Sequence, residues 1–224
     1  MLLQAKVLPG ANEVATKSIF YLNRYLQTTN TTIYTFASSD LGVASADRRV
    51  IVGAHMYGST SRSLSSATIN GVSATILTTN TATTGNVVLI IANVTSGTTG
   101  DIVLTWSGSC AGSAVTVWYA TGLTSDTPVA TARNASLTAP TSGSLTTVDG
   151  GFIVCAATCR YNDGTTRTHS WTNATEQFDA ELENTGTDGG SISGAHIATT
   201  GSSVTVTDTF STSAGTGVGA FASF

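Results

Sequence analysis

The sequence predicts an all-β protein folded as an antiparallel sandwich or barrel, and three observations support this fold class. Short runs of β-branched and aromatic residues recur about every 10–15 residues and are separated by turn residues. Ser, Thr and Gly, which form helices poorly, fill much of the remaining sequence. The 224 residues include only three prolines, so the residue that most often breaks a strand ladder is rare.

The first expected strand covers the apolar and aromatic segment Ile19–Leu26. A helix over residues 13–26 is the competing interpretation, because the apolar residues loosely follow a helical period, but the Tyr, Phe and Ile content favours a strand. The turn Thr28–Thr31 separates this strand from the alternating segment Thr32–Phe36, and Arg49–Tyr57 follows. The domain therefore begins with three expected strands in a row.

The clearest local motif is a β-hairpin at Asn70–Gly71. Ala67–Ile69 and Val72–Ile76 flank this dipeptide, which tolerates positive φ at both central turn positions. Further strands are expected at 86–94, 101–107, 113–121, 129–138, 151–160, 167–171, 174–182, 191–198, 203–210 and 216–224. All-β sandwiches and barrels often form one unit of about 200–250 residues. This sequence shows no linker, so we predict one domain at residues 18–224.

The first 17 residues differ from the rest of the chain. They contain both lysines of the protein, Lys6 and Lys17, together with Pro9–Gly10, and they show no clean period. We interpret residues 1–17 as an N-terminal arm, with an edge strand and loop as the alternative. The arm lacks the basic and apolar regions of a secretory signal, so we expect synthesis in a cytosol.

Charged residues are scarce. They make up 10% of the chain, against about 25% in typical domains, and the only one between Arg62 and Asp126 is Asp101. The formal net charge of −4 leaves no basic surface for nucleic acid. No apolar segment approaches the roughly 18 residues of a transmembrane helix, so no membrane insertion is expected.

The three cysteines, Cys110, Cys155 and Cys159, do not suggest a disulfide framework, because their number is odd. Cys155 and Cys159 share one face of an expected strand, about 13 Å apart, whereas a disulfide spans at most about 7 Å between Cα atoms. We predict that they are small buried apolar residues rather than a zinc pair.

The strongest argument for an enzyme is a group of four carboxylates, Glu176, Asp179, Glu181 and Glu183. The last three are spaced i, i+2 and i+4, so they would share one face of a strand. Retaining glycosidases need two carboxyl groups about 5–5.5 Å apart, so a β-sandwich glycoside hydrolase using Glu181 and Glu183 is one hypothesis. The order of residue types differs from the glycosidase motif, however. A solvent-facing strand face, with Phe178, Ala180 and Leu182 pointing inward, explains the same pattern.

No other motif predicts catalysis or a cofactor. The histidines, His55, His169 and His196, are scattered, and partly buried, hydrogen-bonded histidines are a simpler expectation than a metal site. Asn162–Gly164 and Gly186–Gly190 offer too few carboxylates for calcium and are expected to be tight turns. We therefore predict a protein without enzymatic activity, metal or cofactor.

Three aromatic residues, Trp118, Trp171 and Tyr161, support one alternative function. Sugar-binding sandwiches stack pyranose rings on exposed aromatic side chains, so recognition of a surface polysaccharide through these three residues is one hypothesis. Trp118 and Tyr119 are adjacent and face opposite sides of a strand, so one of the two is expected in the core.

The most distinctive strand and turn segments are Thr32–Phe36, Asp40–Gly42, Arg48–Gly53, Ala67–Thr75 and Gly97–Gly108. Together they resemble virion structural proteins of tailed bacteriophages. The resemblance extends over residues 18–224 and rests on strands and turns rather than on catalytic residues. It implies a single β-sandwich, jelly-roll-like in design, that belongs to a virus particle.

The function implied by this resemblance is that of a capsid decoration, or cement, protein. Such a protein is assembled in the host cytoplasm and exposed on the surface of the virion. Its partners would be the major capsid protein and copies of itself, with a homotrimer as one arrangement. We expect the N-terminal arm, with Lys6, Pro9 and Lys17, to make the capsid attachment. A location on the neck or tail stays open.

Overall fold

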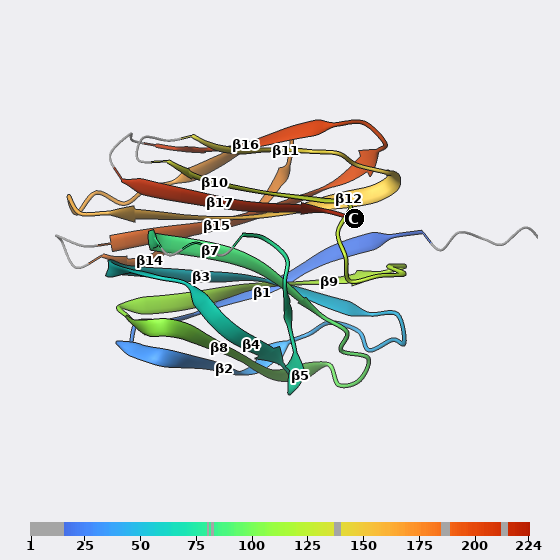
Figure 1. The fold of residues 1–224 in the computed structure, drawn as a ribbon, viewed down its shortest axis with the longest axis horizontal. Coiled ribbons are helices and arrows are strands. Elements are labelled where there is room, and N and C mark those ends of the chain that lie inside the picture. Colours follow the sequence, from blue (N-terminus) through green and yellow to red (C-terminus); the bar gives the residue numbers. More distant parts are fainter. Residues whose placement is uncertain (1–15, 80, 82, 137–139, 185–188, 212–214) are drawn as a thin grey trace, which may run out of the picture.

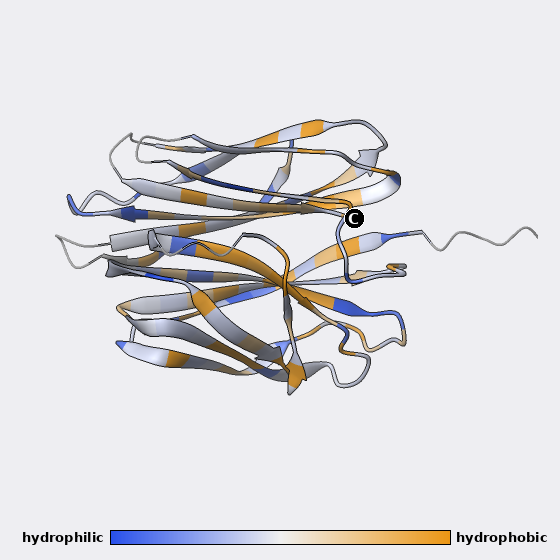
Figure 2. Ribbon diagram, viewed as in Figure 1, coloured by the Kyte–Doolittle hydropathy of each residue, from blue (hydrophilic) through white to orange (hydrophobic). Residues whose placement is uncertain are grey.

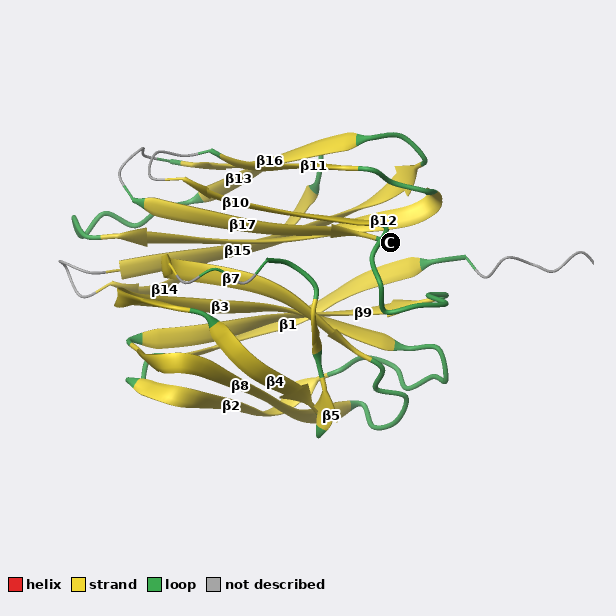
Figure 3. Ribbon diagram, in the orientation of Figure 1, coloured by secondary structure: helices red, strands yellow, loops and turns green. Residues whose placement is uncertain are grey.

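The computed structural model describes residues 16–79, 81, 83–136, 140–184, 189–211 and 215–224. These residues form β-strands connected by loops and turns, without a helix (Figure 3). The predicted all-β class is therefore confirmed, and the expected strand at Ile19–Leu26 is confirmed against the competing helix. Within the described residues, no helix is long and apolar enough to cross a membrane.

The strands form four antiparallel sheets that are stacked as layers (Figure 1). Sheet 1 contains β2 (Thr31–Asp40), β8 (Thr99–Cys110), β4 (Leu64–Ile69) and β5 (Val72–Ser73) in this spatial order. Sheet 2 contains β1 (Ser18–Gln27), β9 (Gly112–Thr121), β3 (Arg49–Arg62), β7 (Thr83–Ala92) and β6 (Thr75–Ile76). The first half of the chain thus builds two neighbouring layers.

The second half of the chain builds the other two layers. Sheet 3 contains β10 (Ala130–Ser136), β17 (Thr216–Ser223), β12 (Asp149–Tyr161), β15 (Gly189–Thr200) and β14 (Thr175–Asn184). Sheet 4 contains β11 (Thr141–Leu145), β16 (Val204–Phe210) and β13 (His169–Thr172). Sheets 2 and 3 face each other in the middle of the stack. The strands thus occupy four sheets rather than the two of a single sandwich.

Continuous apolar runs mark the two central sheets, because both of their faces are covered. In β7, Val88 and Ile90 pack against sheet 1, whereas Val87, Leu89 and Ile91 pack against sheet 3. Figure 2 shows β7 as hydrophobic along much of its length. Strands of the outer sheets instead alternate between buried and more exposed residues, as β8 does, because one of their faces meets solvent.

The structure contains the predicted hairpin at Asn70–Gly71 and the predicted buried cysteines. Asn70 and Gly71 have φ values of 51° and 76° and join Ile69 to Val72 in the β4–β5 hairpin, as the turn chemistry requires. Cys110, Cys155 and Cys159 are buried free thiols, so the prediction of buried apolar cysteines is confirmed.

Candidate functional site

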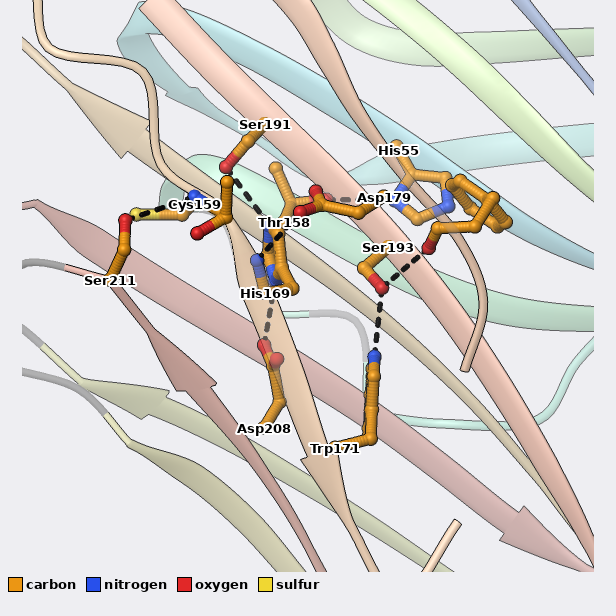
Figure 4. A network of polar contacts seen from close by, with 12 residues as sticks. His55, Thr158, Cys159, His169, Trp171, Asp179, Ser191, Ser193, Asp208 and Ser211 are labelled. Atoms are coloured by element: carbon orange, nitrogen blue, oxygen red, sulfur yellow. Dashed lines mark hydrogen bonds and ion pairs between the residues drawn. The ribbon is translucent and has the colours of Figure 1, made fainter. Parts of the chain in front are cut away.

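The most extensive polar cluster of the interior is centred on His169, at the start of β13 (Figure 4). Its Nδ1 lies 2.9 Å from Oδ2 of Asp208 on β16, and its Nε2 lies 2.9 Å from Oγ of Ser191 on β15. An acid, an imidazole and a serine in this order form the catalytic triad of many hydrolases. A catalytic triad also needs a serine that a substrate can reach, so the burial of the cluster decides whether it could act as one.

Burial argues against a catalytic role for this triad-like cluster. The side chains of His169 and Asp208 are fully buried, and Ser191 is fully buried as well. The edge of the Phe210 ring covers the imidazole, with the ring centroids 5.0 Å apart. A serine nucleophile must be reachable by an acyl group, so we interpret the cluster as a structural connection between sheets 3 and 4.

Further hydrogen bonds extend this connection. Trp171 donates from Nε1 to Oγ of Ser193 at 2.8 Å, and Ser193 donates to the carbonyl of Phe178 at 2.8 Å. The backbone N–H of His169 donates to Oδ2 of Asp179 at 2.9 Å. The short strand β13 is thereby fixed to sheet 3 by side chains as well as to its neighbour β16 by backbone pairing.

A second buried histidine lies between sheets 2 and 3. His55 on β3 has Nδ1 2.8 Å from Oγ1 of Thr158 on β12 and Nε2 3.1 Å from Oγ1 of Thr116 on β9. Desolvation by burial, assisted by nearby His169, lowers the pKa of His55 to about 3. The imidazole is therefore neutral at physiological pH, with both nitrogens engaged, as expected for a satisfied buried histidine.

Two carboxylates of β14, Asp179 and Glu181, accept hydrogen bonds from neighbouring strands and loops. Glu181 accepts hydrogen bonds at 2.9 Å from Tyr161 and from Thr166. The pKa of Tyr161 is raised, mainly by burial and secondly by its hydrogen bond to Glu181. As predicted, Phe178, Ala180 and Leu182 pack inward. The side chain of Glu183 lies outside the described residues. In the part of the chain that the structure describes, no three His, Cys, Asp or Glu residues form a metal-binding group.

Two of the three residues proposed to stack on glycans are unsuited to this role. Trp118 and Tyr161 are buried, at 0% and 1% exposure, so their selection as glycan-stacking residues was wrong. Trp118 packs between sheets 2 and 3, where its ring meets Tyr21 edge-on. Trp171 is half-buried, and its indole N–H is already used. The prediction that one of Trp118 and Tyr119 lies in the core is confirmed.

Of the residues assigned to capsid attachment, Lys6 and Pro9 lie outside the described residues, whereas Lys17 is described. Lys17 borders two pockets, of about 280 and about 160 Å³. We call their combined lining the root surface, because the N-terminal segment joins the domain there. Its members are Lys17, Ser18, Ile19, Phe20, Leu123, Thr124, Ser125, Thr127, Val129, Gly151, Phe152, His196, Ala198 and Phe224.

The root surface presents apolar side chains to solvent. Phe20 and Val129 are 47% and 45% exposed, and Phe20 stacks on Tyr119 with ring centroids 4.8 Å apart. Gly42 packs so closely on Tyr119 that a Cβ would lie 2.4 Å from the ring, which places the loop containing exposed Val43 beside this surface. Apolar residues exposed together are typical of interaction sites.

A buried arginine fixes the loop that borders the root surface. The guanidinium of Arg48 is fully buried and donates hydrogen bonds to four backbone carbonyls. The acceptors are Leu41, Gly42, Val94 and Ser96. Because these carbonyls come from two different loops, Arg48 gives this end of the molecule a defined shape.

Sequence reasoning did not find the interior network. Asp208 and Ser191 are 39 and 22 residues from His169, and they come together only through the pairing of strands from two sheets. Spacing along the chain carries no sign of such a cluster. Comparison with known proteins adds no assignment, since no protein-family model and no curated protein matches the chain.

Proposed function

We propose that this protein is a non-enzymatic structural protein of a bacteriophage virion, a decoration protein that binds the outer surface of the capsid. The resemblance of its strand and turn motifs to tailed-phage virion proteins suggests this class. The observation that carries the proposal is the root surface, where Lys17 and the exposed side chains of Phe20 and Val129 surround the point at which the arm begins.

The proposed mechanism is burial of the root surface and arm against major capsid subunits and neighbouring copies of this chain. Lys17 is the only Lys, Arg, Asp or Glu among the residues that line the root surface, so the proposed attachment depends on apolar burial rather than on ion pairs. At 0.1 M salt, interactions between exposed charges are largely screened beyond about 10 Å, and this distance shortens as the salt concentration rises. Attachment should therefore persist at salt concentrations that release proteins held by charge.

The experiment measures co-sedimentation of the purified protein with particles that lack it. Removal of residues 1–17, or the double substitution Phe20→Ser with Val129→Ser, is expected to reduce binding at least tenfold while the circular dichroism spectrum stays unchanged. Ile33→Ser is the matched control, because Ile33 is 55% exposed on β2 and lies outside the root surface. Full binding by the truncated chain would refute the mechanism.

Immunogold labelling of native particles tests the location independently. Gold over the head supports decoration, whereas gold confined to the tail would refute it and favour the alternative of a glycan-binding tail or fibre module. No structural observation favours that alternative at Trp118 or Tyr161, so such a module would have to bind glycans through other residues.

A further inference from the structure

Strand pairing follows the same nested scheme in both halves of the chain. In the first half, β1 pairs with β9, β2 with β8 and β3 with β7. In the second half, β10 pairs with β17, β11 with β16 and β12 with β15. In each half, therefore, the first strand lies beside the last, the second beside the second last, and the third beside the third last.

The spatial orders of the strands agree position by position as a result. Sheet 2 has the order β1-β9-β3-β7-β6 and sheet 3 the order β10-β17-β12-β15-β14. Sheet 1 begins β2-β8-β4 and sheet 4 reads β11-β16-β13. A hairpin of eight strands rolled into two facing sheets is the jelly-roll arrangement. We infer that the chain is a tandem pair of jelly rolls, and that the face between sheets 2 and 3 is a protein–protein interface whose partner is a second jelly roll.

Approximate twofold symmetry supports this inference. Gly53 and His55 of β3 face Ala156 and Thr158 of β12, so these equivalent strands run in the same direction and meet at the same level. On one side of them β7 packs on β17. The strand orders make β15 the equivalent of β7 and β9 the equivalent of β17. On the other side of the central pair, β15 and β9 also meet, where Gly194 contacts the ring of Trp118. Exchanging the two halves therefore matches one contacting pair of strands with the other, although β7 packs more extensively on sheet 3 than β15 does on sheet 2.

The interface has the composition of a permanent subunit contact. Leu89 and Ile91 of sheet 2 meet Val154 and Ala220 of sheet 3 in an apolar cluster contributed by both halves, with His55 as a buried polar contact. Permanent interfaces resemble a domain core cut in half. Each half also has a separate core, between sheets 1 and 2 and between sheets 3 and 4, and each is about 100 residues long, an ordinary domain size.

The covalent connection between the halves is the segment 122–129, where Asp126 pairs with Arg49. If the halves recognise each other as subunits do, this connection is dispensable after folding. The experiment inserts a protease recognition sequence after Thr124 of the full chain and cuts the folded protein. We expect the fragments to elute together at the mass of the intact chain, with an unchanged circular dichroism spectrum.

Two interface substitutions then test the partner surface from either side. Leu89→Glu alters only the first half and Ala156→Glu only the second, and both residues are fully buried between sheets 2 and 3. In each cut variant we expect the fragments to separate at about half the mass, with the unsubstituted half still folded. Ala135→Glu, at an exposed position of β10, is the control and should leave the cut chain intact.

Three results would overturn the inference. One is loss of β structure when the connection is cut, and another is an unsubstituted half that unfolds once it is separated. The third is continued co-elution of the cut chain in both glutamate variants, which would place the association elsewhere. The outcome does not depend on the proposed virion function, since every measurement uses the purified chain alone.

Discussion

His55 Nδ1 lies 2.8 Å from Thr158 Oγ1, and this contact connects the two halves of the chain across the middle of the sheet stack. Both residues are fully buried, so the imidazole cannot gain a proton without losing the solvation that water would give its charge. The interface between sheets 2 and 3 therefore contains a group that couples stability to pH.

Stability should decrease as the pH falls below 6.5. The pKa of His55 is lowered to about 3 in the folded protein, so between these values the unfolded chain binds a proton that the folded chain does not. The free energy of unfolding then falls by about 1.4 kcal/mol per pH unit from this group. Urea unfolding at pH 7 and pH 5 measures the effect.

The control for this prediction is His55→Gln, which keeps a hydrogen-bonding side chain but cannot titrate. Its stability at pH 7 should be lower than that of the parent, whereas its loss of stability between pH 7 and pH 5 should be smaller. An unchanged pH dependence in this variant would assign the effect to another group. His196, whose pKa burial also lowers, is the next residue to test.

Ser191→Ala should lower stability and leave the fold intact. The substitution removes the partner of His169 Nε2 in a fully buried position, and an unsatisfied buried polar group costs about 1–3 kcal/mol. Chemical unfolding of Ser191→Ala beside Ser202→Ala, an exposed serine, gives the difference. Equal stability of the two variants would contradict the structural role of the cluster.

Gly53→Ala should destabilise the contact between the two halves. A Cβ at Gly53 would lie 2.4 Å from Thr116 Oγ1 and 2.9 Å from the Cβ of Ala156, and overpacking a core costs about 1–3 kcal/mol. Gly71→Asn is the control, because nothing lies within 4 Å of that position and Asn tolerates its φ of 76°. Thermal unfolding should rank the parent and the control above Gly53→Ala.

The three thiols should be unreactive in the folded protein. Burial raises the pKa of Cys110 to about 11 and that of Cys159 to about 12, and it raises the pKa of Cys155 well above its ordinary value. The thiolate is the reactive form, so alkylation at pH 8 followed by mass spectrometry should find no label within minutes. Labelling of all three in urea is the positive control, and rapid labelling of the native chain would contradict the burial.

Most strands could be predicted from local sequence, whereas the number of stacked sheets could not. Asn70–Gly71 specifies its hairpin because few dipeptides tolerate two positive φ values. The continuous apolar run Val87–Ile91 also indicated a strand covered on both faces, since such a strand does not alternate between apolar and polar residues. Which sheet covers each face depends on pairings such as Ser18 with Thr121, and these follow from the whole topology rather than from any local segment.

The candidate site was predictable only in part, for a similar physical reason. Lys17 was selected because lysine is rare in this chain, and the structure places it at the root surface. Trp118 and Tyr161 were selected by residue type, yet large aromatic rings fill cores as readily as they line binding sites. Their burial depends on neighbours such as Gly194, whose missing side chain makes room for Trp118.

The nested pairing of strands also sets the order of events during synthesis on the ribosome. Because β1 pairs with β9, its partner is not available until about a hundred residues later, and contacts of such long sequence separation slow folding. Until then the first half exposes apolar strands with unpaired edges, which are prone to aggregation. The second half can close only when β17, at the end of the sequence, reaches β10 and β12.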